Sequence, residues 1–576
     1  MSEASLEGPW KRTAQLSVIV VGCVMFLFHM VSSQFAFLGE LEMQNYHLAF
    51  ALTLTFLVGA EYARSKMVRT YVVLMLALSL FVTGYVHFNM NELEANVGFP
   101  GKLDVVVGLL IMFVVIEATR LAWGIVLPIV AMIFVLYFFL GHHIPGALYH
   151  HKFGFDFVVS YLSIGLSGVY GSFLSVSGNS VFLFVVFGSL LSLIRVNDLF
   201  LELGKAAGRV LEGGPGQTAV VASSLVGMVT GAAVANVAVT GAFTIPFMKK
   251  AGYKPYEAGA IEATASTGGQ IMPPVMGASA FLMASFMGVS YASVMAAALL
   301  PALLYYWCVM LGVQFISINR GVKAPKEKVD KRLLVSRLPA FLIPLTLLVV
   351  LLAMRYSPGI AAFWAIVVGI LLSYVNVQTR PTGLGQVCKA IAEGSVVGAK
   401  IAVSLAVVGI MAQTLISTGL GNKIAGLVEL LSGGNVVVAL VLTMLVSIIL
   451  GCGVPTSAAY ALVAIIVVPT LIHIGVSEVS AHFFAFYFAV ISAITPPVAL
   501  AALAGAAISG APSMRTSFAA FKLAVSGFII PFLVVFNPAI VFNFESVEWA
   551  IGSAIAVPIG LTAFTALLYG CGLSLT

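Results

Sequence analysis

Runs of about 20 consecutive apolar residues recur from one end of this 576-residue chain to the other. Each run is long enough to cross about 30 Å of hydrocarbon as an α-helix, and the alternating pattern of membrane β-strands is missing. Hydrophobic residues make up 61% of the chain and charged residues 9%, a balance that excludes a soluble globular protein. We predict an all-α polytopic membrane protein with spans near 15–37, 46–63, 71–88, 104–119, 121–141, 179–194, 291–318, 335–354, 360–378, 396–418, 521–541 and 549–572.

The placement of charge predicts which loops face the cytoplasm. Lysine and arginine gather in alternate loops, as at 64–69 and 195–209, whereas acidic or neutral loops such as 92–94 lie between them. By the positive-inside rule, the basic loops and the N-terminus are cytoplasmic. The net charge of +6 therefore indicates topology rather than a nucleic-acid surface. The first run lacks a small-residue cleavage site, so we expect a retained span and not a signal peptide.

Two intervals, 216–290 and 435–510, are apolar but too rich in Gly, Pro, Ser and Thr for simple spans. They form a repeat, because four Pro and Gly positions recur 223 residues later and three Gly positions recur 220 residues later. The second unit is therefore slightly longer before its first proline. The first set pairs Pro246, Gly252, Pro273 and Pro274 with Pro469, Gly475, Pro496 and Pro497, and the second pairs Gly213, Gly214 and Gly231 with Gly433, Gly434 and Gly451.

Each repeat predicts a re-entrant hairpin with a small-residue tip, followed by a helix that is broken at Pro-Pro. Lys249 and Lys250 follow the first hairpin and place its open end in the cytoplasm, whereas "HIGVSEVSAH" after the second lacks Lys and Arg. The two repeats are therefore expected to be inverted. Inverted repeats with broken helices are the plan of secondary transporters, since irregular backbone at membrane depth is tolerated where protein or a cavity lines it.

The tips and the breaks supply neutral oxygen atoms. The tips read "GAAVANVAVTG" from Gly231 and "GCGVPTSAAY" from Gly451, and the breaks read "STGGQIMPP" and "SAITPP". Free carbonyls and hydroxyls of this kind suit a hard monovalent cation. Helix packing through small residues and kinks without a ligand are the alternatives. We expect a cavity, an ion or a hairpin tip beside the segment from Thr267 to Gln270. Glu262, about three turns or less before the first break, is the best candidate among ionisable residues for a role beyond structure.

Motifs of membrane enzymes are missing. The chain has no G-x-x-x-x-G-K-[ST] loop, no H-E-x-x-H motif and no aspartate at the centre of a span. The five cysteines show no paired spacing, so neither a disulfide framework nor a zinc site is expected. The loop from His142 to His151 is interpreted as an exposed polar loop, with a metal site as the alternative. We expect no enzymatic activity and no cofactor other than a coupling ion.

The two repeat units resemble the large membrane subunit of TRAP (tripartite ATP-independent periplasmic) transporters, and more narrowly the TAXI branch, in which the small and large membrane subunits are fused. The stretches that carry the resemblance are "GAAVANVAVTGAFTIPFMKKAGYKPYEAGAIEATASTGGQIMPPVMGASAF", "GCGVPTSAAY" and "AVISAITPPVALAALAG". The resemblance covers residues 10 to 540. It implies an inverted-repeat elevator-type transporter of the bacterial inner membrane, which imports small organic anions (carboxylates or sulfonates) with sodium.

The same resemblance implies a periplasmic TAXI-type binding protein as partner, and a monomer, with a dimer as the alternative. Coupling to protons, or transport without a binding protein, remains the alternative function. The implied organisation is a four-helix region similar to the small subunit at 1–120, scaffold and arm helices at 121–215, a first hairpin and broken helix at 216–290, scaffold helices and a second arm at 291–434, a second hairpin and broken helix at 435–510, and C-terminal spans at 511–576.

Two groups of site residues are implied by the resemblance. Sodium would be bound where each tip meets a broken helix, by Gly231, Ala235, Asn236, Gly268, Gly451, Gly453, Thr456, Ser457 and Thr495. Substrate would be bound by Ser266, Thr267, Gly269 and Gln270, together with Asn236 and Ser457. The first tip departs from the family pattern, because Gly231, Ala232 and Ala233 stand where relatives commonly carry serine, so a hydroxyl ligand is missing there.

Overall fold

The computed structural model describes residues 9–35, 38–63, 65–165, 167–193, 195–211, 213–322, 328–375, 379–543 and 546–570, and every regular element in these ranges is a helix. Twelve of the described helices are long and apolar enough to cross a membrane. This confirms the all-α polytopic prediction. Parts of the predicted spans 15–37, 360–378 and 549–572 lie outside the described residues.

Two predicted spans differ from the helices that the structure shows. The span at 46–63 is α2 (Glu40–Glu61), which is too polar to be among the twelve because its first two turns carry Gln44, Asn45 and His47. Neighbouring segments satisfy these groups: Asn45 donates to the carbonyl of Thr83 at 2.9 Å and accepts from Tyr170 at 2.8 Å. Conversely, α21 (Thr456–His473) is among the twelve, although the sequence placed it in a hairpin.

The chain divides into two compact units. The first comprises Met1–Leu193, Val350–Val375 and Arg380–Leu427, and the second comprises Ile194–Val349, Asn376–Thr379 and Val428–Thr576. The principal helices of the first unit are α1 (Pro9–Gln34), α2, α3 (Lys66–Phe88), α4 (Met90–Ala95), α5 (Lys102–Trp123), α6 (Val126–Leu140), α7 (Phe155–Leu162), α8 (Ser172–Val176), α9 (Phe182–Leu191), α17 (Pro358–Val375) and α18 (Leu384–Thr418). Helices α16 (Lys331–Ala353) and α19 (Leu420–Ser432) each contain a boundary between the units.

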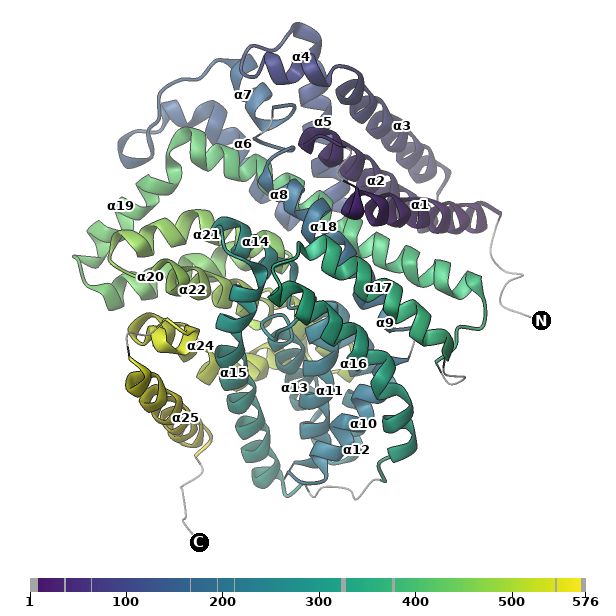
Figure 1. Ribbon diagram of the computed structural model, residues 1–576. Coiled ribbons are helices and arrows are strands. Elements are labelled where there is room, and N and C mark those ends of the chain that lie inside the picture. Colours follow the sequence, from purple (N-terminus) through teal and green to yellow (C-terminus); the bar gives the residue numbers. More distant parts are fainter. Residues whose placement is uncertain are drawn as a thin grey trace. The chain divides into compact units, whose positions relative to one another are not determined.

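The first unit is organised around α18, a helix of 35 residues that packs against α1, α2, α5, α6 and α9. Its sequence is apolar on nearly all sides, as expected for a helix with neighbours all round. Small residues allow close approach: a Cβ on Gly22 of α1 would lie 2.9 Å from the Cα of Ala392. Ser395 donates to the carbonyl of Gly22 at 2.9 Å. Figure 1 shows α1, α2 and α3 side by side in this unit.

The second unit contains both repeats. The first repeat is α11 (Gly214–Thr230), α12 (Ala233–Lys250), α13 (Pro255–Gly268) and α14 (Ala278–Phe286), and the second is α20 (Val436–Gly451), α21, α22 (Glu478–Ile491), a 3-10 turn (Ser492–Ile494) and α23 (Leu500–Ser509). Helices α12 and α21 each have 18 residues and begin 223 positions apart, as do α13 and α22 with 14 residues each. The hairpins pack as antiparallel pairs, α11 on α12 and α20 on α21. The rest of the unit is α10 (Val196–Gly208), α15 (Tyr291–Arg320), most of α16, α24 (Ser513–Phe536) and α25 (Val547–Tyr569).

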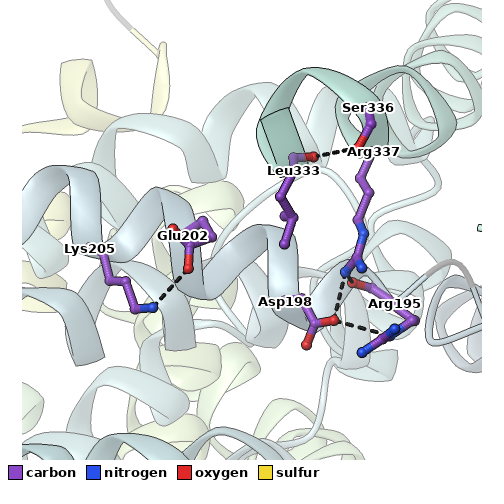
Figure 2. Close-up of polar contacts among 7 residues, drawn as sticks. All are labelled: Arg195, Asp198, Glu202, Lys205, Leu333, Ser336 and Arg337. Carbon is purple, nitrogen blue, oxygen red and sulfur yellow. Dashed lines mark hydrogen bonds and ion pairs between the residues drawn. The ribbon is translucent and has the colours of Figure 1, made fainter. Parts of the chain in front are cut away.

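An ionic network joins the start of α16 to α10, as Figure 2 shows. Arg337, only 6% exposed, donates to Asp198 at 2.6 Å and to the carbonyl of Arg195 at 3.1 Å. The Arg195 side chain also contacts Asp198, at 3.1 Å. Lys205 pairs with Glu202 at 2.8 Å one turn further along α10. Basic residues that sequence analysis interpreted only as topology signals therefore also hold these two helices together.

Candidate functional site

Both broken helices are interrupted at the predicted Pro-Pro pairs. Helix α13 ends at Gly268 and α14 begins at Ala278, and the corresponding gap in the second repeat separates Ile494 from Leu500. Proline removes a backbone N–H and disfavours helical geometry before it, so the helices end there. The peptide bonds Pro273-Pro274 and Pro496-Pro497 are cis. Two residues with positive φ that are not glycine, Met276 (58°) and Ala499 (44°), also lie 223 positions apart, so the backbone of the two breaks repeats as the sequence does.

The tip of the first hairpin packs directly on the first break. A Cβ on Gly227 would lie 2.7 Å from the Cα of Gly269, and one on Gly231 would lie 3.0 Å from the Cα of Gly277. Only residues without side chains permit backbones to approach so closely. Gly231 ends α11 in the left-handed region, at φ 62°. Its carbonyl accepts a hydrogen bond from the Nε2 atom of Gln270 at 3.2 Å.

The tip of the second hairpin packs on the second break in the same way. A Cβ on Gly451 would lie 2.5 Å from the hydroxyl of Ser492, which donates to the carbonyl of Gly451 at 3.1 Å. Gly453 turns the chain at φ 73°. Thr456, at the start of α21, donates to the Oε1 atom of Gln270 at 3.1 Å. Gln270 therefore contacts both tips, and the segment from Thr267 to Gln270 has the neighbour that the sequence predicted.

Several predicted site residues direct their side chains into the protein. Asn236 has no exposed surface and donates to the carbonyl of Ser223 at 2.7 Å. Ser266 donates to Glu262 at 3.1 Å. The hydroxyl groups of Thr267 and Thr495 bond to carbonyls within their own helical segments, those of Ala263 and Ile491. Ala235 is exposed, Ser457 is buried, and Gly268 lies against the ring of Tyr305. The sodium and substrate roles of these residues stay predictions.

Sequence reasoning missed three groups of residues around the breaks. Thr230, the last residue before the first tip, has a buried hydroxyl oxygen without a hydrogen-bond partner among the described residues. Tyr305 and Tyr306 donate to the carbonyls of Thr264 and Ala265 at 2.9 Å, so aromatic hydroxyls take up carbonyls near the end of α13. Ser223, Thr240 and Thr244 surround Glu262. A signal existed for the last group, since Asn236, Thr240 and Thr244 follow one another at the four-residue spacing of one helix face.

A polar cavity of about 470 Å³ lies in the first unit, lined by His29, Ser33, Glu40 and Asn179 among other residues. Behind it, His29 contacts His47 at 2.8 Å between ring nitrogens, and His47 contacts the hydroxyl of Ser177 at 2.9 Å. Both rings are buried. Across the described part of the chain, no group of three or more His, Cys, Asp or Glu side chains is arranged to hold a metal ion.

Comparison with known proteins agrees with the geometry of the two repeats. Residues 110–549 match the family described as tripartite ATP-independent periplasmic transporter, DctM component, and this range contains both hairpins and both breaks. The sequence is also similar to a protein of Sinorhizobium fredii named uncharacterized protein y4mL, with 31% identity over 194 residues. That alignment covers 33% of this chain and 46% of the relative, so the chain matches less than half of the relative's length. The family match spans most of the chain, and we conclude that the protein belongs to the DctM family of TRAP transporter membrane components, which are transporters and not enzymes.

Proposed function

We propose that the protein is a sodium-coupled secondary importer of small organic anions that receives its substrate from a periplasmic TAXI-type binding protein. The observation that carries this proposal is the meeting of two hairpin tips, each packed on its own broken helix, at the single side chain of Gln270. Such a centre offers backbone and neutral oxygens inside an otherwise apolar unit. Discontinuous helices of secondary transporters use groups of this kind for coupling ions and substrate.

Sodium would be bound at each tip. At the first tip, the carbonyl of Gly231 and the unpartnered hydroxyl of Thr230 are the supporting oxygens. Thr230 supplies the hydroxyl that the sequence lacks at the next three positions. The other proposed ligands at this site are Ala235, Asn236 and Gly268, of which Ala235 and Gly268 offer only backbone atoms. At the second tip the proposed ligands are Gly451, Gly453, Thr456, Ser457 and Thr495.

The substrate anion would be bound between the tips, by backbone amides and polar groups of Ser266, Thr267, Gly269 and Gln270, with Asn236 and Ser457. Because the hydroxyls of Ser266 and Thr267 are turned inward, their contribution in this conformation would come from the backbone. A carboxylate or sulfonate would also be stabilised by the positive field of bound sodium and by amides at the helix ends.

The remaining parts of the proposal concern the partner and the movement. The family match leaves residues 1–109 outside, which supports a fused region similar to the small membrane subunit. The N-terminus would be cytoplasmic in the inner membrane, and the hairpins with their broken helices would move as one core by an elevator mechanism. Close backbone contacts between tips and breaks support movement of these segments together.

The proposal is tested with the full chain in proteoliposomes, in the presence and absence of the binding protein encoded beside it. Radiolabelled C4 and C5 dicarboxylates and C2 sulfonates are offered under an inward sodium gradient. We expect accumulation of at least one probe that requires both the sodium gradient and the binding protein. Uptake that is unchanged without sodium contradicts the coupling, and uptake that is unchanged without the binding protein contradicts the partner. Binding of ²²Na⁺ to the purified chain provides a measurement that needs no substrate.

A further inference from the structure

Glu262 lies inside the first repeat with none of its surface exposed, surrounded by hydroxyl groups from three helices. Ser223 of α11 donates to its Oε1 atom at 2.7 Å, and Ser266, one turn further along α13, donates to the same atom at 3.1 Å. From α12, Thr240 donates to Oε1 and Thr244 donates to Oε2. Four hydroxyl groups therefore bond to one carboxyl group.

The second repeat builds the same place from apolar residues. The positions 223 residues after Thr240, Thr244, Glu262 and Ser266 are Val463, Val467, Ala485 and Ala489, and all four are buried. Helices α12 and α21, and α13 and α22, match in length at this offset. The polar cluster is therefore not needed to form the hairpin and broken helix. A carboxyl group that the fold does not need, and that costs free energy to bury, indicates a function.

No charged partner lies beside the Glu262 carboxyl group among the described residues. Its four bonded partners are neutral, and the charged groups of the packed helices have other contacts or lie at helix ends. Helices α11 and α23 have no ionisable residue, and the titratable hydroxyl nearest in its electrostatic effect is that of Tyr306 on α15, which donates to the carbonyl of Ala265. The other groups are Lys249 and Lys250 at the end of α12, Glu257 paired with Arg320 of α15, Arg515 and Lys522 in α24, and Glu478 and His482 in α22.

The spacing of the oxygens suits a proton better than a metal ion. The hydroxyl of Ser223 lies 2.7 Å from Oε1 of Glu262 and 3.1 Å from the hydroxyl of Thr240. These are hydrogen-bond distances between oxygens in mutual contact, which leave no space for a cation among them. A proton needs no such space, because it occupies one of the existing oxygen-to-oxygen contacts. A buried carboxyl group without a cation is also less costly when it is neutral.

We propose that Glu262 is a proton-binding site of the transport core, which takes up a proton from water on one side of the membrane and releases it on the other. The hydroxyls of Ser223, Thr240, Thr244 and Ser266 stabilise the ionised form between release and uptake. Three of these hydroxyl groups lie on the hairpin, so a change in the packing of α11 or α12 on α13 alters the proton affinity. The coupling of this proton to substrate movement rests on the proposed function, whereas the binding of the proton does not.

The binding step is tested by infrared difference spectroscopy of the full chain in lipid, titrated with acid and base in sodium-free buffer. We expect the carbonyl-stretch band of a protonated carboxylic acid, which disappears as the pH rises and is absent from Glu262→Gln. The matched control Glu257→Gln changes a carboxylate on the same helix that is already ion-paired, so the band stays. A band that survives in Glu262→Gln overturns the proposal. A wild-type band that is absent, or that persists at every pH, does the same.

Two further variants keep the test decisive if Glu262→Gln does not fold. The variant Thr240→Val/Thr244→Val keeps the carboxyl group but removes two donors, so the band moves to higher frequency without being lost. The variant that also carries Glu262→Ala and Ser266→Ala reproduces the residues of the second repeat, which are compatible with this fold, and must lose the band. Because neither sodium nor substrate is present, this outcome is independent of sodium-driven uptake. The transport step is then read as substrate-dependent acidification inside proteoliposomes, one proton per cycle in wild type and none in Glu262→Gln.

Discussion

The contact between the first hairpin and the first break predicts a specific effect of Gly269→Ala. The backbone of Gly269 has φ −60° and ψ −28°, which alanine adopts without strain, so the substitution tests only the space around the new methyl group. That methyl group would lie 2.7 Å from the carbonyl carbon of Gly227 and 3.2 Å from the backbone nitrogen of Met228. Because both neighbours are backbone atoms, no side chain can rotate away, and the hairpin itself must move.

The size of the effect follows from these distances. Carbon atoms in contact are about 3.5 to 4.0 Å apart, so the hairpin must withdraw by roughly 1 Å. Such overpacking costs about 1–3 kcal/mol. The movement also stretches the bond from Gln270 to the carbonyl of Gly231 beyond hydrogen-bonding range, which adds about 0.6 kcal/mol. The total of about 1.5–4 kcal/mol corresponds to a factor of about ten to several hundred in the opening equilibrium of the tip.

Hydrogen–deuterium exchange of the purified chain measures this opening. We expect the amides of peptides covering 223–240 in Gly269→Ala to lose protection by that factor, while peptides covering 447–460 at the second tip change by less than about tenfold. The control Gly560→Ala adds a methyl group to a helical glycine with open space around it, and both tips should keep their protection. Unchanged exchange at the first tip in Gly269→Ala would refute the argument that backbone contact holds hairpin and break together.

Three other substitutions test separate contacts. Thr456→Val removes the donor to Gln270 and should weaken ²²Na⁺ binding about three- to tenfold, with unchanged affinity counting against a role of this tip. Tyr306→Phe leaves a carbonyl of α13 unpaired and should lower the free energy of unfolding by about 1–3 kcal/mol, measured by thermal denaturation against an exposed Tyr→Phe control. A double-mutant cycle of Arg337→Gln and Asp198→Asn should give a coupling energy of about 1 kcal/mol, and additive effects would show that the pair in Figure 2 contributes nothing.

The hairpins and breaks could be predicted from the sequence because proline and glycine act on the backbone where they stand. Pro273 and Pro496 each lie next to a second proline, and the helices end before both pairs. The tip glycines were equally informative, since Gly231 needs a positive φ that other residues rarely adopt. Such local effects do not depend on distant partners. The bounds of α11 and α12 accordingly agree with the predicted hairpin to within a few residues.

Side-chain partners could not be predicted in the same way, because they depend on which segments meet in space. Asn236 was expected to be free for sodium, but its amide donates to Ser223, thirteen residues earlier on the facing helix. Gln270 and Thr456 are 186 positions apart, and no periodicity relates them. Tyr306 lies in an ordinary apolar span, where an aromatic residue gives no sign that its hydroxyl caps a broken helix. Polar residues at the start of α2 concealed a helix for the same reason.

The position of Gln270 has a thermodynamic consequence for the two hairpins. Its amide nitrogen donates to one tip while its oxygen accepts from the other, so both tips share one planar group. An ion that displaces Thr456 from this group changes the free energy with which Gly231 is held. Linkage then requires the reverse effect to be equally large, whichever site is filled first. Occupancy of the two ion sites would therefore be cooperative, and the Hill coefficient for sodium, compared between wild type and Gln270→Leu, would measure how much of that cooperativity one side chain carries.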